Sequence, residues 1–401
     1  MNKTMIPAIL GGDPVRKTGI PYGRQYIDEA DIQAVSDILR SEFLTTGPMV
    51  EKFENKLCEI TNAKYSVVVS SGTAGLHAAC HAAEISKGDE VIISAVTFAS
   101  TANAVLFCGG TPVFADIDEL NWNVDPLEIE KKITNKTKAV IAVSLTGQAV
   151  KIDEIREICE RHHLIFIEDA SHSLGSKYKG QPIGSLADMT VFSFHPVKTI
   201  TTGEGGAIMT NSPELYQRLK LFRTHGITRD PSLLSRKRYH GYNEQIDLGY
   251  NYRLTDFQAA LGISQLDKLD LFIARRKEIV EMYNKALSNV PGIILQQEIS
   301  ESDTSKHIYP IRIDSKILGV SRDEFYQAMI KENIGLQVHY MPVYKHPYYQ
   351  NNGYKNVICP KAEALYESMM SIPIFYSMTD EDVFGVINGV KKLAEYYVSG
   401  I

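Results

Sequence analysis

Between Lys64 and Asn211, short apolar runs alternate with segments of helical periodicity, and this alternation restricts the possible folds more than any other feature. The apolar runs include YSVVVSS at 65–71, LIFIED at 164–169 and MTVFSF at 189–194. Strands this uniformly apolar are typical of a sheet that is covered on both faces. The alternation therefore predicts an α/β domain of three layers, with helices on both sides of a mostly parallel sheet.

The segments on either side of this region predict an arm and a second, smaller domain. DEADIQAVSDILRS at 28–41 has the pattern of an amphipathic helix, and 253–287 is a long helical segment that opens with a capping box of Thr255 and Gln258. Short strands and helices follow it and indicate an α+β domain. We place the boundary within the long helical segment, so that 1–268 holds the helical arm and the large domain and 269–401 the small C-terminal domain.

Composition excludes several classes of protein. The 401 residues carry a formal net charge of −6 with both signs interspersed, which argues against nucleic acid as a partner. The five cysteines form no CxxC pair, so the sequence suggests neither a metal site nor a disulfide framework. No run of about 18 apolar residues is present, and the N-terminus lacks the apolar core of a signal peptide. We expect a cytoplasmic protein with no membrane segment.

Polar residues follow the predicted strands, where parallel sheets bind ligands. In SSGTAGL at 70–76, Gly72 allows close approach of the backbone, and the amides of Thr73 and Ala74 open a helix. Such a helix start can hold a phosphate group. The same residues, taken alone, more often form an N-cap without a ligand.

Two further features have both a chemical and a structural interpretation. Asp169 ends an apolar strand, and an unpaired buried carboxylate is costly, so it should face a cation or a strong donor, or else cap the next turn. Lys198 lies between a strand and the glycines of FSFHPVKTITTGEGG at 192–206. A partly desolvated lysine can attack a carbonyl carbon, although a loop lysine usually lies at the surface. Phe98 could cover a flat ring or pack in the core.

Together, these features match the requirements of one cofactor. Pyridoxal 5′-phosphate (PLP) needs a lysine for a Schiff base and an acid opposite its pyridine nitrogen. The phosphate needs a cup, and the ring needs a flat cover. The sequence supplies Lys198, Asp169, the 70–76 helix start and Phe98 for these four roles.

The chain resembles the DegT/DnrJ/EryC1/StrS nucleotide-sugar aminotransferase family from about Ile6 to Tyr397. The resemblance implies the fold-type I, aspartate aminotransferase-like architecture of PLP-dependent transferases for the large domain. The motifs that carry it are LTTGPMVEKFE (44–54), SSGTAGLHAA (70–79), IEDASHSLGS (167–176), FSFHPVKTITTGEGGAIMTN (192–211), RTHG (223–226) and DLGYNYRLTDFQAALGISQL (247–266).

The resemblance also implies residue roles. Lys198 would form the Schiff base and shuttle a proton, and Asp169 would pair with the pyridine nitrogen. Dehydratase relatives carry histidine at the lysine position, so this chain should transaminate. Asn251 would reach the phosphate of a neighbouring subunit, which implies a homodimer with its active site at the interface. The other implied cofactor contacts are Gly72, Thr73, Ala74 and Ser193 on the phosphate, Phe98 on one ring face, and His172 and Gln148 beside the ring.

The substrate expectation depends on His195-Pro196-Val197, which most resemble enzymes of pseudaminic acid synthesis. That subgroup transfers the amino group of L-glutamate to C4 of a UDP-linked 4-keto-6-deoxy-2-acetamido-L-sugar. The product is UDP-4-amino-4,6-dideoxy-N-acetyl-β-L-altrosamine. Enzymes acting on the D-gluco isomer or on UDP-4-keto-arabinose share nearly all the motifs and remain alternatives. Candidates for holding the diphosphate are Arg229, Lys237, Arg238, His339 and Tyr340.

Two other classes of function are alternatives to the aminotransferase. A non-catalytic PLP-fold regulator would keep the fold without the reaction, but no basic DNA-binding arm is present. A doubly wound dehydrogenase would need a GxGxxG loop after its first strand, which SSGTAGL lacks.

Overall fold

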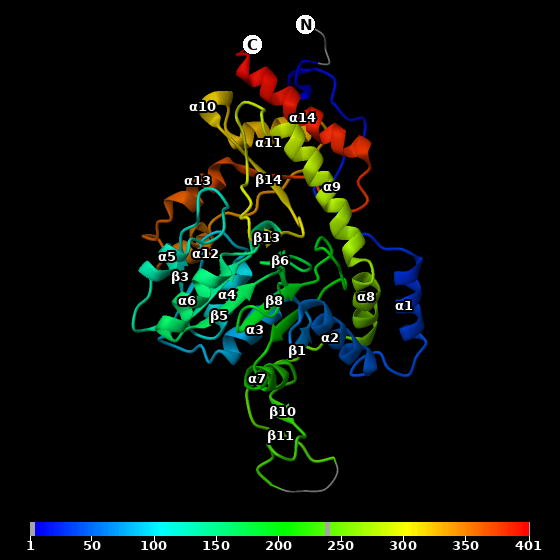
Figure 1. The fold of residues 1–401 in the computed structure, drawn as a ribbon, viewed down its shortest axis with the longest axis vertical. Helices are drawn as coiled ribbons and strands as arrows, with labels where there is room; N and C mark the ends of the chain where they lie inside the picture. Colours follow the sequence, from blue (N-terminus) through cyan, green and yellow to red (C-terminus); the bar gives the residue numbers. More distant parts are fainter. Residues whose placement is uncertain (1–4, 237–240, 401) are drawn as a thin grey trace.

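The computed structural model describes residues 5–236 and 241–400, and a seven-stranded sheet forms its centre (Figure 1). The strand order is β1-β9-β8-β5-β4-β2-β3. Neighbouring strands are parallel except at β9, which runs antiparallel to both β1 and β8. The predicted mostly parallel sheet is confirmed. Its strands are β1 (Tyr65–Val69), β2 (Glu90–Ser94), β3 (Thr111–Ala115), β4 (Thr137–Val143), β5 (Ile165–Asp169), β8 (Met189–Ser193) and β9 (Gly206–Thr210).

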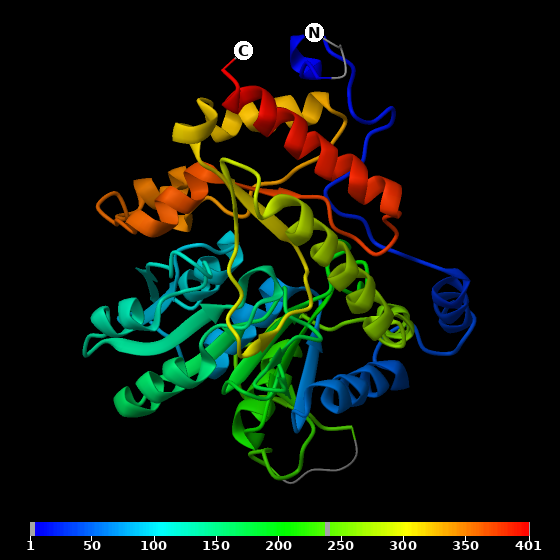
Figure 2. The ribbon, with the colours of Figure 1, turned by 45° about the horizontal axis from the view of Figure 1, so that its top comes forward.

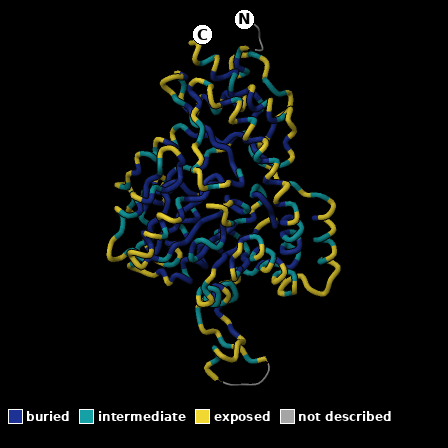
Figure 3. Tube along the Cα trace, in the orientation of Figure 1, coloured by how far each residue is buried: buried dark blue, intermediate teal, exposed yellow. Residues whose placement is uncertain are grey.

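Side chains along each strand alternate between two apolar layers. On β1, Val67 and Val69 belong to one layer, and Val68 belongs to the other. Burying each such side chain stabilises the fold by ~1.5–3 kcal/mol relative to leaving it exposed. Figure 3 shows the buried residues gathered in the interior of the molecule and the exposed ones around its periphery. The first layer is completed by α3 (Gly72–Ala82), α4 (Ala99–Phe107) and α7 (Pro213–Arg223), and the second by α2 (Pro48–Thr61), α6 (Ile152–His162) and α8 (Asp256–Leu266).

A second, three-stranded antiparallel sheet lies above the first (Figure 2). With the helices around it, this sheet forms a separate apolar core, and we call this part the C-terminal layer. The division at residue 268 stays a prediction. Residues such as Tyr344 and Leu365 lie late in the chain but pack in the core of the large sheet. The C-terminal layer contains β12 (Ile293–Leu295), β14 (Tyr309–Ile313), β15 (Met369–Ile372), α9 (Leu269–Leu287), α11 (Arg322–Lys331) and α14 (Asp380–Val398).

Helix α9 belongs to both cores. Its first turns place Phe272 and Ile273 against the large sheet. Further along, Ile279 and Tyr283 are buried in the C-terminal layer. One helix therefore holds the two parts together.

Other elements lie at the edges of these layers. The arm helix α1 (Glu29–Leu39) packs on α8, where the buried Asp31 accepts a bond of 2.7 Å from Lys268 Nζ. The hairpin of β10 (Ile227–Thr228) and β11 (Glu244–Gln245) projects from the body (Figure 1). None of the helices in residues 5–236 and 241–400 is both long and apolar enough to span a bilayer. The short elements are η1 (Ala8–Leu10), α5 (Pro126–Lys131), η2 (Leu145–Gly147), β6 (Lys177–Tyr178), β7 (Gln181–Pro182), β13 (Ser302–Asp303), α10 (Ser315–Leu318), η3 (Val343–Lys345), α12 (Pro347–Asn351) and α13 (Pro360–Ser368).

A buried carboxylate fastens the N-terminal segment to the C-terminal layer. Glu332, at the end of α11, is fully buried and pairs with Lys392 of α14 at 3.0 Å. Its oxygens also accept the amides of Ala8 and Val15, each at 2.8 Å. Three groups from two distant segments thus meet at one side chain.

We predict that Glu332→Ala lowers the melting temperature by roughly 5 °C or more, since removing one partner of a buried ion pair costs about 3–5 kcal/mol. The cost arises because the Lys392 ammonium loses its carboxylate partner, keeping only the carbonyl of Asp13, and two backbone amides lose their acceptor. Differential scanning calorimetry measures the shift. The matched control is Glu395→Ala on the exposed side of α14. This variant should have the same melting temperature as the wild type. Equal melting temperatures of the two variants would show that the contacts of Glu332, which we call the Glu332 clamp, add no stability.

Candidate active site

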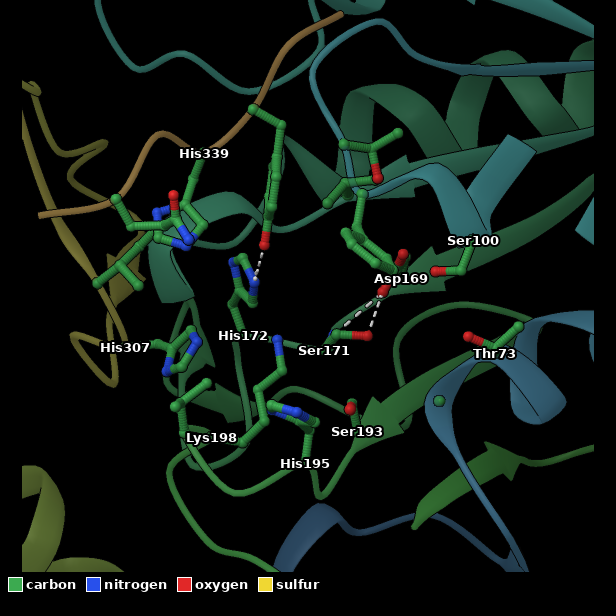
Figure 4. A pocket seen from close by; sticks show the side chains of 18 of the residues that line it. Thr73, Ser100, Asp169, Ser171, His172, Ser193, His195, Lys198, His307 and His339 are labelled. Atoms are coloured by element: carbon green, nitrogen blue, oxygen red, sulfur yellow. Dashed lines mark hydrogen bonds between the residues drawn. The ribbon is translucent and has the colours of Figure 1, made fainter. Parts of the chain in front are cut away.

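A cavity of about 530 Å³ opens between the large sheet and the C-terminal layer (Figure 4). It lies at the carboxyl ends of β5 and β8, where a parallel sheet is expected to bind its ligand. Helix starts and loops from the large sheet form one side, and the residues just before β14 and the segment after α11 form the other. Its lining includes Gly72, Thr73, Phe98, Asp169, His172, Ser193, Lys198, His307, His339 and Tyr340.

The start of α3 forms one corner of the cavity. The amides of Gly72 and Thr73 open the helix and have no acceptor within it, so they and the helix dipole favour an anion. A Cβ at Gly72 would stand 2.9 Å from Cβ of Ser193, so only glycine lets the helix start lie against that serine. The amide of Ala74 donates to Ser71 Oγ at 3.1 Å instead. Of the two amides predicted to hold a phosphate group, that of Thr73 is open, whereas that of Ala74 serves the N-cap. The amide of Gly72, which the resemblance implied as a further contact, is open as well.

Asp169 lies at the end of β5 and is only 4% exposed. Its Oδ2 accepts a bond of 2.8 Å from the Thr101 hydroxyl, and its Oδ1 accepts the hydroxyl and the amide of Ser171 at 2.6 and 3.2 Å. The carboxylate thus caps the following turn and also faces the cavity, so both sequence interpretations apply. Neither Thr101 nor Ser171 was predicted from the sequence. A serine two residues after an aspartate is a common turn signal that could have indicated the latter.

Lys198 lies half-buried at the floor of the cavity, in the loop after β8 (Figure 4). Within the described residues its Nζ makes no ion pair or hydrogen bond. Burial lowers the pKa of Lys198 to about 8, and the nearby Asp169 carboxylate opposes the decrease. A substantial fraction of this amine is therefore neutral near physiological pH, as a nucleophile or base requires.

Three histidines surround the amine. His172 Nε2 lies 3.2 Å from the Tyr340 hydroxyl, and its ring centre is 4.5 Å from that of His307. His339 Nδ1 pairs with Ser371 Oγ at 2.8 Å. Burial lowers the pKa of all three, to about 3 for His339 and well below the ordinary range for the others. They are uncharged at neutral pH and add no positive charge next to Lys198.

Phe98 caps α4 at the rim of the cavity, with its side chain 60% exposed. Its ring lies 5.9 Å from that of Tyr340, edge to face. Core packing, the alternative interpretation, does not apply to this residue. The ring is placed to cover a flat ligand.

Gln148 does not lie beside the cavity, contrary to the expectation from the resemblance. Its Oε1 accepts the amide of Ile299 at 2.7 Å, and its Nε2 donates to the carbonyl of Asn121 at 3.2 Å. The side chain is buried and ties two loops together, which leaves no group for a ligand.

The remaining candidates divide into three groups. His339 and Tyr340 line the cavity. Asn251 is exposed at the root of the β10–β11 hairpin, and Arg229 lies exposed within it, so neither reaches the cavity of its own chain. Lys237 and Arg238 fall outside the described residues.

Comparison with known proteins identifies the family. The model of the DegT/DnrJ/EryC1/StrS aminotransferase family matches residues 25–391. The chain belongs to the DegT/DnrJ/EryC1/StrS aminotransferase family. It is therefore an aminotransferase of the PLP-dependent type, and the predicted cofactor is confirmed.

Two relatives from bacteria cover nearly the whole chain. The spore coat polysaccharide biosynthesis protein SpsC of Bacillus subtilis is 40% identical over 94% of this chain and 97% of its own length. The UDP-4-amino-4,6-dideoxy-N-acetyl-beta-L-altrosamine transaminase of Campylobacter jejuni is 37% identical over 93% and 99%.

Solved structures of aminotransferases share the fold. Helicobacter pylori PseC, described as an aminotransferase involved in the biosynthesis of pseudoaminic acid, superposes with a TM-score of 0.88 at 33% identity, over 95% of this chain and 100% of that one. The PLP form of Spr1654, a sugar aminotransferase of Streptococcus pneumoniae by its description, gives 0.87 at 31% identity over 94% and 99%. The predicted fold-type I architecture is confirmed.

The residues of this cavity fit PLP. The open amides at Gly72 and Thr73 suit its phosphate, the Asp169 carboxylate suits a protonated ring nitrogen, and the Lys198 amine suits its aldehyde. These groups share one cavity. We therefore propose that each residue binds the part of the cofactor that it suits.

We predict that borohydride reduction of the holoenzyme fixes the cofactor on Lys198. Peptide mass spectrometry should find the added mass on the peptide that contains this residue. Lys198→Ala should retain no covalent cofactor, whereas Lys179→Ala, which changes a surface lysine, should label normally. Labelling of another lysine in the wild type would contradict the assignment.

We also predict that the rate at which the apoprotein takes up PLP rises with pH, with a midpoint near 8, because only the neutral amine attacks an aldehyde. Stopped-flow absorbance at several pH values measures the rate. Asp169→Asn removes a charge that holds the Lys198 pKa up, so its midpoint should move to lower pH. A midpoint near that of an ordinary lysine would show that the amine is not desolvated.

Proposed function

We propose that this protein transfers the amino group of L-glutamate to C4 of a UDP-linked 4-keto-6-deoxy-2-acetamido sugar, forming UDP-4-amino-4,6-dideoxy-N-acetyl-β-L-altrosamine. The similarity to the C. jejuni transaminase and to PseC supports the sugar. The observation that carries the proposal is the desolvated Lys198 amine in one cavity with Asp169 and the start of α3.

Each residue of the cavity would have a separate role in the reaction. When bound, PLP supplies a ring that accepts electrons as bonds at the amino carbon break. Nζ of Lys198 removes the α-proton of glutamate and later returns a proton to C4 of the sugar. The Asp169 carboxylate keeps a proton on the ring nitrogen, and the amides of Gly72 and Thr73 hold the phosphate at the helix start. Neutral His172 packs beside the reacting centre without repelling a cationic ring.

A different keto-sugar is the principal alternative. The chain is as similar to SpsC, whose name refers to spore coat polysaccharide, as to the C. jejuni enzyme. The D-gluco isomer and UDP-4-keto-arabinose therefore belong among the candidate acceptors.

We further propose that two copies form a homodimer in the cytoplasm, with the active site at their interface. Asn251 follows a segment in which Leu248 is 71% exposed and Tyr250 is partly exposed. Exposed apolar side chains of this kind are typical of a contact surface. The predicted contact of Asn251 with a partner's phosphate depends on this arrangement.

The decisive experiment supplies the holoenzyme with L-glutamate and a panel of UDP-4-keto-sugars. We expect glutamate alone to bleach the visible absorbance of the cofactor and release 2-oxoglutarate. Mass spectrometry should then detect an amino sugar, and NMR should assign the L-altro configuration. Lys198→Ala should lower the rate by at least ~10³-fold, since it loses both the nucleophile and the base.

Other outcomes of that experiment point elsewhere. Absorbance that does not respond to glutamate would favour the non-catalytic regulator. Efficient amination of the D-gluco isomer or of the arabinose derivative would replace the proposed substrate with one of the alternatives.

A further inference from the structure

The N-terminal segment, which lies outside the large sheet, places the aromatic residue Tyr22 at the cavity. Beyond the Glu332 clamp, the amide of Ile20 donates to the carbonyl of Asn333 at 3.0 Å, and the amide of Gly335 donates back to Ile20 at 2.8 Å. The carbonyl of Tyr22 then accepts the amide of Ile374 at 3.2 Å. Backbone bonds to two segments of the C-terminal layer therefore fix Tyr22 in place.

Gly335 makes this close approach possible. A Cβ at this position would stand 2.8 Å from the carbonyl oxygen of Ile20 and 3.2 Å from Cα of Pro21. Both are backbone atoms, so any larger residue would have to displace the segment. The position of Tyr22 therefore depends on a glycine more than 300 residues away.

The Tyr22 side chain lines the cavity next to His339, with 5.7 Å between ring centres. Among the described residues, its hydroxyl has no hydrogen-bond partner. Burial raises the pKa of Tyr22, so the hydroxyl keeps its proton and can donate as well as accept. In Figure 4, His339 and His307 lie on the other side of Lys198 from Thr73, away from the corner that suits a phosphate.

Tyr22 and residues 337–340 together form a wall of the cavity that we call the neutral wall. Its members are a tyrosine, a glutamine, a valine, a neutral histidine and a second tyrosine, so it carries no charge. Burying the carboxylates of an amino acid against such a wall would be costly. Flat apolar faces combined with neutral donors and acceptors suit a sugar ring instead.

We propose that Tyr22 is a specificity residue for the acceptor, its hydroxyl binding a polar substituent of the keto-sugar ring and its ring covering one face of that sugar. This inference rests on the proposed function, because it concerns only the second substrate of that reaction. Tyr22 takes no part in binding the amino donor.

Half-reaction kinetics of the holoenzyme separate the two substrates. Tyr22→Phe keeps the ring and removes the hydroxyl, so the KM for the keto-sugar should rise roughly threefold to tenfold, the effect of one neutral hydrogen bond. Tyr22→Ala should raise it by more than about tenfold, since the apolar face is lost as well. The rate with glutamate should stay at the wild-type value in both variants. Calorimetric titration with the amino-sugar product should show the same loss of affinity.

The matched control is Tyr26→Phe, four residues further along the same segment. Its ring packs 4.8 Å from that of Tyr376 and does not line the cavity, so both half-reactions should stay unchanged. Gly335→Ala tests the placement, because displacing the segment should raise the sugar KM while leaving the rate with glutamate intact.

Two results would overturn the proposal, and they differ. If the wild type aminates a keto-sugar and the Tyr22 variants match it in KM and in product affinity, the role of Tyr22 is wrong and the proposed function stands. If the wild type reacts with glutamate but accepts no nucleotide keto-sugar, the proposed function and this inference both fail. A loss of the glutamate half-reaction in Tyr22→Phe would also contradict the assignment.

Discussion

The rest of this structure depends on one constraint, the desolvation of the Lys198 amine. The Asp169 carboxylate is close enough to raise the pKa of that amine. Such an amine favours its neutral form only if the chain around it is fixed without supplying a strong partner. The loop after β8 meets this condition through backbone bonds. Phe194 donates to Gly205 at 2.9 Å and accepts from Thr202 at 3.1 Å, so the loop closes on itself and leaves Nζ of Lys198 free.

The architecture supplies the other groups from separate strands. In a parallel sheet every crossover returns the chain to the same edge, so β5 and β8 end side by side. Asp169 and Ser193 therefore come together although 24 residues separate them in the sequence, and α3 adds its helix start next to Ser193. The C-terminal layer closes the cavity with neutral groups. Charge is thus concentrated on the side that suits the cofactor.

The sequence allowed prediction of what is encoded locally. Apolar runs indicated the strands, and residues directly after them, such as Asp169 and Lys198, proved to share one cavity. Contacts that depend on distant segments were not predictable. Gln148 was wrongly placed because the loop that occupies its amide, around Ile299, lies about 150 residues away. Tyr22 was overlooked for the same reason, since no local pattern indicates that an N-terminal segment crosses to the cavity.

The continuity of α9 has a consequence for how substrates enter. This nineteen-residue helix contains neither proline nor glycine, the usual sites of a kink, yet it is embedded in both cores. A large hinge rotation of one part against the other would have to break that packing or bend the helix. The amino donor and the sugar acceptor would then use one standing entrance in turn, as a reaction in two alternating halves allows, with no need for the protein to open and close around each.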